Sequence, residues 1–192
     1  QVTTVSPNYA SEIRTPGQGY GFDGILRSIS HKLSGILNGI DDQVWNPQTD
    51  TYLPHKYSVD RNYLAGKRKN KEALLNKLGA KDAQSMLDKP LLGLIGRLVE
   101  QKGIDLLLPI ISHFVEHTTV SFVILGSGEK HYEEALQYLA EQHPDRIFLT
   151  IGYSEELAHG IEAGADVFLM PSRFEPCGLN QLYSLKYGTL PI

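Results

Sequence analysis

The run that decides the fold of this chain is Pro171-Ser172-Arg173-Phe174-Glu175-Pro176-Cys177-Gly178-Leu179. An apolar run at 165–170 precedes it and predicts a buried strand. Apolar residues at helical spacing follow it from 179 to 187 and predict a helix. In open α/β sheets, the loops at the carboxyl ends of strands bind ligands. We therefore expect this loop to form part of a ligand site.

Glu175 is the side chain of this loop best suited to chemistry. Pro171 and Pro176 restrict the backbone on either side of it, so its carboxylate should be held in place. The amides that follow lead into a helix N-terminus, which suits a phosphate group. The alternative is that Glu175 only caps the helix. The loop alone does not decide between the two.

Composition bounds the class of protein. With 192 residues, 41% of them hydrophobic, the chain can bury a core without disulfides, and Cys177 is its single cysteine. The net charge of −4 is spread along the sequence and argues against nucleic acid as the main partner. No apolar stretch is long enough to span a membrane. Core-like strand residues at both ends predict a piece of a longer protein.

The pattern along the chain predicts an α/β fold with a parallel sheet and flanking helices. Strands are expected at 2–6, 33–37, 91–96, 120–125, 147–151 and 166–170, with a further strand beginning at 189–192. Helices are expected at 8–13, 25–33, 67–78, 103–117, 132–142, 155–163 and 179–187, and loops at 15–24, 41–54 and 79–89. We assign 1–37 to the end of one domain, 38–54 to a hinge, and 55–192 to a second domain.

A second constellation is Gly96-Arg97-Leu98-Val99-Glu100-Gln101-Lys102-Gly103. It follows a predicted strand and opens a helix, so Arg97 and Lys102 should lie at the same sheet edge as the 171–179 loop. Two converging cations suit a diphosphate, with arginine as a fork and lysine as a compact charge. The alternative is an exposed basic loop that pairs with Glu100 and Asp105.

Two further features lie at this predicted edge. Gly126 and Ser127 follow the next strand and offer a glycine-lined approach for a nucleotide, although the dinucleotide fingerprint is broken and a plain tight turn is the alternative. Tyr153 ends the strand after that. It could stack on a base, or simply be half-buried.

Other chemistry-bearing residues have simpler interpretations. His113 and His117 stand four apart, but no third ligand accompanies them, so we expect surface residues and no metal site. His159 lies among apolar residues and should be a hydrogen-bonded core histidine. The basic run 67–69 should be a solvated face. Cys177 stands at a helix start, which could lower its pKa, yet no histidine partner makes it a nucleophile.

Together these motifs resemble the bacterial glycogen synthases and plant starch synthases. The resemblance is carried by the 172–179 run with Gln181-Leu182-Tyr183, by Gly96-Arg97-Leu98 with Gln101-Lys102-Gly103, by Ala163-Gly164-Ala165-Asp166, by Leu37-Asn38-Gly39-Ile40-Asp41 with Trp45-Asn46-Pro47, and by the opening Val2-Thr3-Thr4-Val5-Ser6-Pro7. It implies the GT-B architecture of two Rossmann-like domains, here the tail of the first and an incomplete second one. It also implies a cytoplasmic enzyme, or one of the plastid stroma if the source is a plant.

The resemblance implies retaining transfer of glucose from ADP-glucose to the non-reducing end of an α-1,4-glucan, without a metal or other cofactor. Arg97 and Lys102 would neutralise the diphosphate leaving group. Glu175 would contact the glucose near its reacting carbon, and Asn38 would reach the sugar from the hinge.

The same resemblance assigns the nucleotide contacts. The amides of Gly178, Leu179 and Asn180 would cradle the distal phosphate, and Tyr153 would lie near the adenine. Tyr183 stands where many relatives in the wider superfamily carry a second glutamate, a difference shared by the glycogen synthase branch. The family's Lys-x-Gly-Gly donor loop is missing, so this chain alone is expected to be inactive or nearly so. The alternatives are another GT-B transferase with a different nucleotide sugar, or a non-catalytic nucleotide- or glucan-binding module.

Overall fold

The computed structural model describes residues 1–58 and 60–192, and these divide into two compact units. The N-terminal unit consists of Gln1–Ile40 and Phe174–Leu179. The C-terminal unit consists of Asp41–Arg173 and Asn180–Ile192. Position 59, inside the predicted domain 55–192, lies outside the described residues. The roles that the sequence assigns to the two domains and the hinge stay predictions.

The N-terminal unit is organised around two short parallel strands, β1 (Val2–Thr4) and β2 (Leu33–Gly35). Helix α1 (Pro7–Glu12) follows β1, and Ser6 caps it by accepting a hydrogen bond from the Tyr9 amide at 3.0 Å. The helix predicted at 25–33 is instead α2 (Asp23–Ser28) followed by the 3₁₀ turn η1 (Ser30–Lys32). Its beginning was missed because Phe22, which precedes it, provides no side-chain cap.

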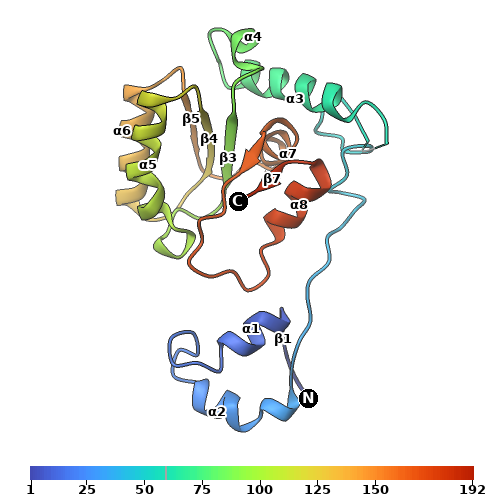
Figure 1. Cartoon of the computed structure of the whole chain (residues 1–192), viewed down its shortest axis with the longest axis vertical. Coiled ribbons are helices and arrows are strands. Elements are labelled where there is room, and N and C mark those ends of the chain that lie inside the picture. The colour runs from blue at the N-terminus through green and yellow to red at the C-terminus, as the bar shows by residue number, and fades with distance from the viewer. Residues whose placement is uncertain (59) are drawn as a thin grey trace. The chain divides into compact units, whose positions relative to one another are not determined.

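The C-terminal unit contains a five-stranded parallel sheet in the order β5-β4-β3-β6-β7 (Figure 1). The chain moves outward from β3 to β5 and then returns to the other side of β3. Such a reversal of strand order places a ligand crevice beside the carboxyl end of the first strand. The predicted alternation of strands and helices is confirmed. The elements are β3 (Leu91–Ile95), α5 (Ile104–His117), β4 (Ser121–Gly126), α6 (Lys130–Gln142), β5 (Ile147–Ile151), α7 (Glu155–Gly164), β6 (Val167–Phe168), α8 (Leu179–Tyr187) and β7 (Leu190–Pro191).

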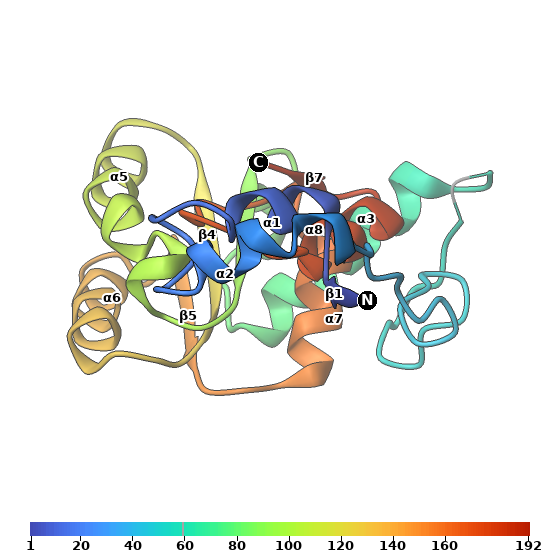
Figure 2. The same cartoon turned by 90° about the horizontal axis from the view of Figure 1, so that it is seen from below.

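Helices cover both faces of this sheet, so its strands are apolar on both sides. Along β4, Phe122 and Ile124 join the core beneath α5 and α6, whereas Val123 and Leu125 join the core beneath α3 (Tyr63–Lys77) and α7. Figures 1 and 2 show α5 and α6 side by side. This explains why the strands read as continuous hydrophobic runs rather than as alternating ones.

Two sequence predictions around α3 were wrong. The helix begins at Tyr63, one turn before the predicted start, and the predicted loop 79–89 contains the short helix α4 (Ala83–Met86), which Asp82 caps. The basic run 67–69 is a solvated face only in part. Lys67 turns inward and donates to Thr189 Oγ1 at 2.5 Å and to the Ala163 carbonyl at 3.1 Å.

Residues 41–58 pack on the C-terminal unit. The Trp45 ring stacks on the rings of His159 and Tyr183, with centroid distances of 3.8 and 4.0 Å. Tyr57 donates to the Tyr187 carbonyl at 2.8 Å. Much of the segment that the sequence assigned to a hinge is thus attached to the second unit by aromatic stacking and buried hydrogen bonds.

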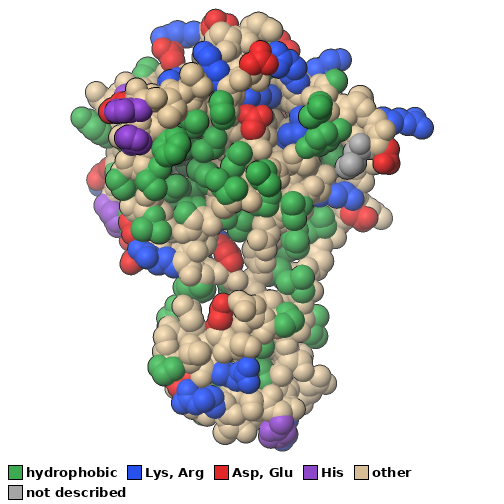
Figure 3. All heavy atoms as spheres, in the orientation of Figure 1, with side chains coloured by type: hydrophobic (Ala, Val, Ile, Leu, Met, Phe, Trp, Pro, Cys, Tyr) green, Lys and Arg blue, Asp and Glu red, His purple; other side chains and the backbone are tan. Residues whose placement is uncertain are grey.

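Exposed hydrophobic side chains remain on the outer side of α5. Leu106, Ile110 and Phe114 follow one another at helical spacing and are 38–45% exposed. Figure 3 shows hydrophobic side chains gathered on the visible face over this helix.

Among the described residues, every helix is too short or too polar to cross a membrane.

Candidate functional site

A pocket of about 290 Å³ lies at the carboxyl edge of the sheet in the C-terminal unit. The ends of β3, β4 and β5 surround it, together with the first turns of α7 and α8. This is the edge that the strand order favours. Its lining residues are Ile95, Gly96, Arg97, Leu125, Gly126, Ser127, Gly152, Tyr153, Ala158 and Asn180.

The loops after β3 and β4 are held together by backbone hydrogen bonds. The Leu98 amide donates to the Ser127 carbonyl at 2.9 Å, and the Glu129 amide donates to the Leu98 carbonyl at 2.8 Å. A Cβ on Gly126 would lie 1.9 Å from the Gly96 carbonyl oxygen. The glycine is therefore required by this close approach. The turn still lines the pocket, so its predicted role beside a nucleotide stays open.

The loop after β3 presents Arg97 to the pocket. Arg97 Nη2 donates to Gln101 Oε1 at 3.0 Å. Glu100 and Asp105, the acidic partners considered for this basic loop, both pair with Arg173. Lys102 ends the 3₁₀ turn η2 (Glu100–Lys102) and is half-buried. Sequence inspection missed Arg173 because it lies about seventy positions from these carboxylates.

Tyr153 is 85% exposed at the rim of the pocket, so the half-buried interpretation was wrong. Ser154 follows it and caps α7 by accepting a hydrogen bond from the Leu157 amide at 3.2 Å. The tyrosine is therefore attached to a fixed helix start while its ring faces solvent. An exposed ring in this position can stack on a planar ligand. Base stacking by Tyr153 stays a prediction.

Asn180 joins the start of α8 to the end of β3, because its Nδ2 donates to the Ile95 carbonyl at 2.9 Å. Gly178, just before the helix, has a φ of 71°, a conformation that a residue with a side chain adopts only under strain. The backbone amides proposed to cradle a phosphate are thus next to a left-handed turn. The sequence did not anticipate the side-chain bond of Asn180.

The structure brings five of the predicted site residues together around one pocket: Arg97, Gly126, Ser127, Tyr153 and Asn180. The others lie in η2 or in the N-terminal unit, namely Lys102 in the former and Asn38, Glu175, Cys177, Gly178 and Leu179 in the latter. The predicted meeting of Glu175 with Arg97 and Lys102 stays a prediction.

The histidines take the positions expected for them. His113 and His117 are exposed and stack on each other with ring centroids 4.5 Å apart. His159 is fully buried, and its Nδ1 lies 2.7 Å from Asp50 Oδ2. Within 1–58 and 60–192, no group of three or more His, Cys, Asp or Glu side chains is arranged to hold a metal ion.

Asp50 is the centre of a buried network that reaches α7 and α8. It accepts hydrogen bonds from the Tyr187 hydroxyl at 2.5 Å and from the Tyr52 amide at 2.8 Å, in addition to its contact with His159. Burial pushes the pKa of Asp50 upward, but these hydrogen bonds outweigh it and hold that pKa below the ordinary value. His159 directly follows Ala158, which lines the pocket, on the same helix α7.

A second buried network links α3, α7 and α8. Ser184 donates to Glu162 Oε2 at 2.7 Å, and Thr189 donates to the Glu162 carbonyl at 2.5 Å. Burial raises the pKa of Glu162 to about 8 and lowers the pKa of Lys67 to about 8. Nothing in the local sequence marks these residues as buried, because their partners come from distant helices.

The Glu162 carboxyl should make stability depend on pH. Its pKa is about 8 in the folded chain against an ordinary 4.5, so between those values the folded chain binds more protons than the unfolded one. Its contribution is complete below pH 4.5 and is lost as pH rises through 8. We expect the free energy of unfolding to fall by roughly 3–4 kcal/mol between pH 5 and 8 through this group.

Glu162→Gln should flatten that dependence, as measured by urea unfolding at each pH. Lys67 acts above this window and with the opposite sign, because its lowered pKa makes stability rise with pH from about 8 to 10.5. Glu134→Gln, which changes an exposed carboxylate on α6, is the matched control and should keep the wild-type slope. An equal slope in wild type and Glu162→Gln would contradict the assignment.

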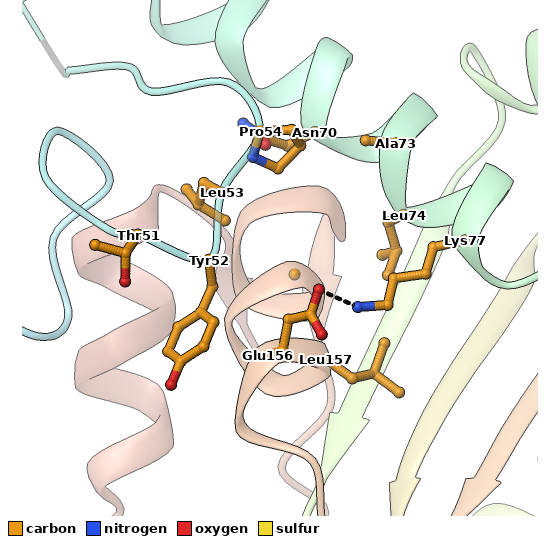
Figure 4. Close-up of a pocket in the computed structure, with 11 residues that line it drawn as sticks. Thr51, Tyr52, Leu53, Pro54, Asn70, Ala73, Leu74, Lys77, Glu156 and Leu157 are labelled. Atoms are coloured by element: carbon orange, nitrogen blue, oxygen red, sulfur yellow. Dashed lines mark ion pairs between the residues drawn. The ribbon is translucent and has the colours of Figure 1, made fainter.

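A second pocket, of about 270 Å³, lies between residues 51–54, α3 and α7 (Figure 4). Tyr52 and Leu53 form one side of it. An ion pair between Lys77 Nζ and Glu156 Oε1, 2.5 Å apart, lies on the other side. All the polar site residues predicted from the sequence lie outside its lining.

Comparison with known protein families identifies the class of protein to which this fold and pocket belong. The family of glycosyl transferases group 1 matches residues 76–192, and the starch synthase catalytic domain family matches residues 1–28. The chain therefore belongs to the group 1 glycosyltransferases. The expected α/β, GT-B fold class is confirmed, as is the expected enzyme class.

Within that class, the chain is similar to proteins named glycogen synthase. It is 55% identical to the glycogen synthase of Hydrogenovibrio crunogenus and 57% identical to that of Cellvibrio japonicus, in each case over 100% of this chain and 39% and 38% of the relative. A structure of the catalytic domain of starch synthase IV from Arabidopsis thaliana, bound to ADP and acarbose, matches with 42% identity and a TM-score of 0.90. That match covers 99% of this chain and 38% of the other. The resemblance inferred from the motifs is confirmed.

Proposed function

We propose that this chain is the nucleotide-sugar side of a glycogen or starch synthase, which transfers glucose from ADP-glucose to the non-reducing end of an α-1,4-glucan with retention of configuration. The observation that carries the proposal is the identity of more than 50% to glycogen synthases over the whole chain. The chain spans less than two fifths of those relatives, so donor, acceptor and activity are all part of the proposal.

The donor would bind in the pocket at the carboxyl edge of the sheet. Arg97 would donate to the diphosphate and Lys102 would add a second positive charge. The amides at the start of α8 would hold the distal phosphate, aided by the helix dipole. Tyr153 would stack on the adenine. The similar starch synthase IV structure is bound to ADP, which supports the choice of nucleotide.

Transfer would proceed by departure of ADP from the anomeric carbon. This leaves positive charge on the sugar and negative charge on the phosphate, and cations fixed beforehand stabilise the latter without reorganising. Glu175 would lie near the reacting carbon, and Asn38 would hold the sugar. We propose that this chemistry uses no metal, because Arg97 and Lys102 provide the positive charge. A cytoplasmic or plastid-stromal enzyme fits this proposal.

Two alternatives lead to different measurements. Another GT-B transferase would prefer a different nucleotide sugar, such as UDP-glucose. A non-catalytic module would bind nucleotide or glucan without transfer, but simple binding does not require Arg97, Lys102 and Glu175 together.

Donor preference can be measured on this chain by thermal unfolding. At a concentration one hundred times its Kd, ADP should stabilise the chain by about 2.7 kcal/mol, which raises the Tm by about 5–10 °C. We expect ADP and ADP-glucose to produce this rise and UDP and UDP-glucose to produce a much smaller one. The reverse order would support the other transferase. Glucose incorporation into glycogen by the protein containing this chain then tests transfer itself.

A further inference from the structure

We propose that Arg173 and Gln101 are positioning residues for the diphosphate site: they fix Arg97 and neutralise the carboxylates beside it. The inference deepens the proposed function, because it concerns the same anion-binding pocket. Arg173 belongs to the run that decides the fold, yet nothing in the proposed mechanism uses its side chain.

The first observation is a chain of hydrogen bonds that runs through Gln101. The Arg173 amide donates to the Gln101 carbonyl at 2.9 Å, and Arg97 Nη2 donates to Gln101 Oε1 at 3.0 Å. Arg97 is otherwise a long exposed side chain with many rotamers, whose ordering would oppose ligand binding. A guanidinium has five donors. One bond to Gln101 can therefore orient it while others remain for a phosphate.

The second observation concerns charge. Arg173 Nη2 lies 2.5 Å from Asp105 Oδ2, and its Nε lies 3.7 Å from Glu100 Oε1. Both carboxylates stand within five residues of Lys102 in the sequence. Unpaired, they would compete for the cations of the loop and repel an incoming diphosphate. Because Arg173 pairs with both of them, the two carboxylates present less uncompensated negative charge to an anion in the pocket.

The third observation is a close backbone contact between the turn that contains Lys102 and the turn that contains Arg173. Gly103 has a φ of 68°, and a Cβ on it would lie 2.1 Å from the Pro171 carbonyl oxygen. The turn that carries Arg173 is therefore seated directly on the turn that carries Lys102. The ion pairs of Arg173 and this backbone contact therefore both hold the two turns together.

The test measures anion affinity of the whole chain by calorimetry, with inorganic pyrophosphate and ADP as probes. Arg173→Gln should weaken the binding of both by about tenfold, which corresponds to ~1.4 kcal/mol. Arg173→Lys, which keeps the charge but loses the fork, should lose less. The decisive variant is Arg173→Gln combined with Asp105→Asn: if Arg173 acts by neutralising carboxylates, the second change should recover several-fold of the lost affinity.

Arg68 lies on α3 and makes an exposed pair with Asp88, so Arg68→Gln is the matched control and should bind both probes as wild type does. Equal affinity in wild type and Arg173→Gln would overturn the inference, and so would the lack of any recovery in the double variant. Pyrophosphate binding without ADP binding would count against the proposed nucleotide alone, and the variants would then be compared on pyrophosphate. A wild-type chain that binds neither probe would overturn both proposals.

Discussion

Arg97→Ala is expected to weaken ADP binding by about 30- to 100-fold, which corresponds to roughly 2–3 kcal/mol. The guanidinium lines the pocket and is oriented by Gln101, so its removal takes away charge-assisted hydrogen bonds to the diphosphate rather than a solvated side chain. The affinity for adenosine, which has no phosphate, should change little. Calorimetry with ADP and adenosine on wild type and variant gives both values.

The matched control for this variant is Lys81→Ala. Lys81 pairs with Asp145, which precedes β5 and therefore lies at the opposite, amino edge of the sheet. The control removes one positive charge from the chain but none from the pocket, so ADP affinity should stay within twofold of wild type at physiological salt. Equal losses in Arg97→Ala and Lys81→Ala would mean that only overall charge matters, and the pocket assignment would then be wrong.

Asp50→Ala is expected to lower the free energy of unfolding by about 4 kcal/mol. The carboxylate is 3% exposed and bonds to His159, the Tyr187 hydroxyl and the Tyr52 amide. Its removal leaves these buried groups without their acceptor. For a chain of this size the Tm should fall by about 10 °C. Urea and thermal unfolding measure the two quantities.

The controls separate this network from loss of charge alone. Asp42→Ala changes an exposed aspartate of the same segment and should cost less than about 0.5 kcal/mol. Asp50→Asn keeps the shape and one acceptor oxygen, so an intermediate loss is expected. A loss below 1 kcal/mol for Asp50→Ala would show that the network around His159 is not what attaches residues 41–58 to the second unit.

Local patterns predicted the strands and helices of the C-terminal unit well. Short apolar runs such as 91–96 and 120–125 are typical of buried strands. Because a helical segment separates each run from the next, the pattern predicts a parallel sheet. The patterns failed where polar side chains turn inward, as with Lys67, which the sequence assigned to a solvated face. Lys67 lies in α3, a helix whose start the sequence did not mark because Asn62 gives it no side-chain cap.

The candidate site divides in the same way. Arg97, Gly126 and Tyr153 lie at or just after the ends of β3, β4 and β5, and Asn180 lies at the start of the helix that follows β6. Parallel strands must bring their carboxyl ends to one edge of the sheet. That much follows from the order of elements. Which carboxylate pairs with which cation does not follow, because Arg173 and Asp105 are far apart in the sequence and meet only when two turns pack together.

The sequence by itself determined the fold class, the edge of the sheet at which the site lies and, through its motifs, the family. These depend on short-range signals: periodicity, strand-end loops and one specific run. Only the tertiary structure decided that Glu100 and Asp105 pair with Arg173, that Asp50 holds His159 and Tyr187, and that Lys67 and Glu162 are buried. The physical reason is that burial and charge pairing depend on neighbours from distant segments, which no local pattern records.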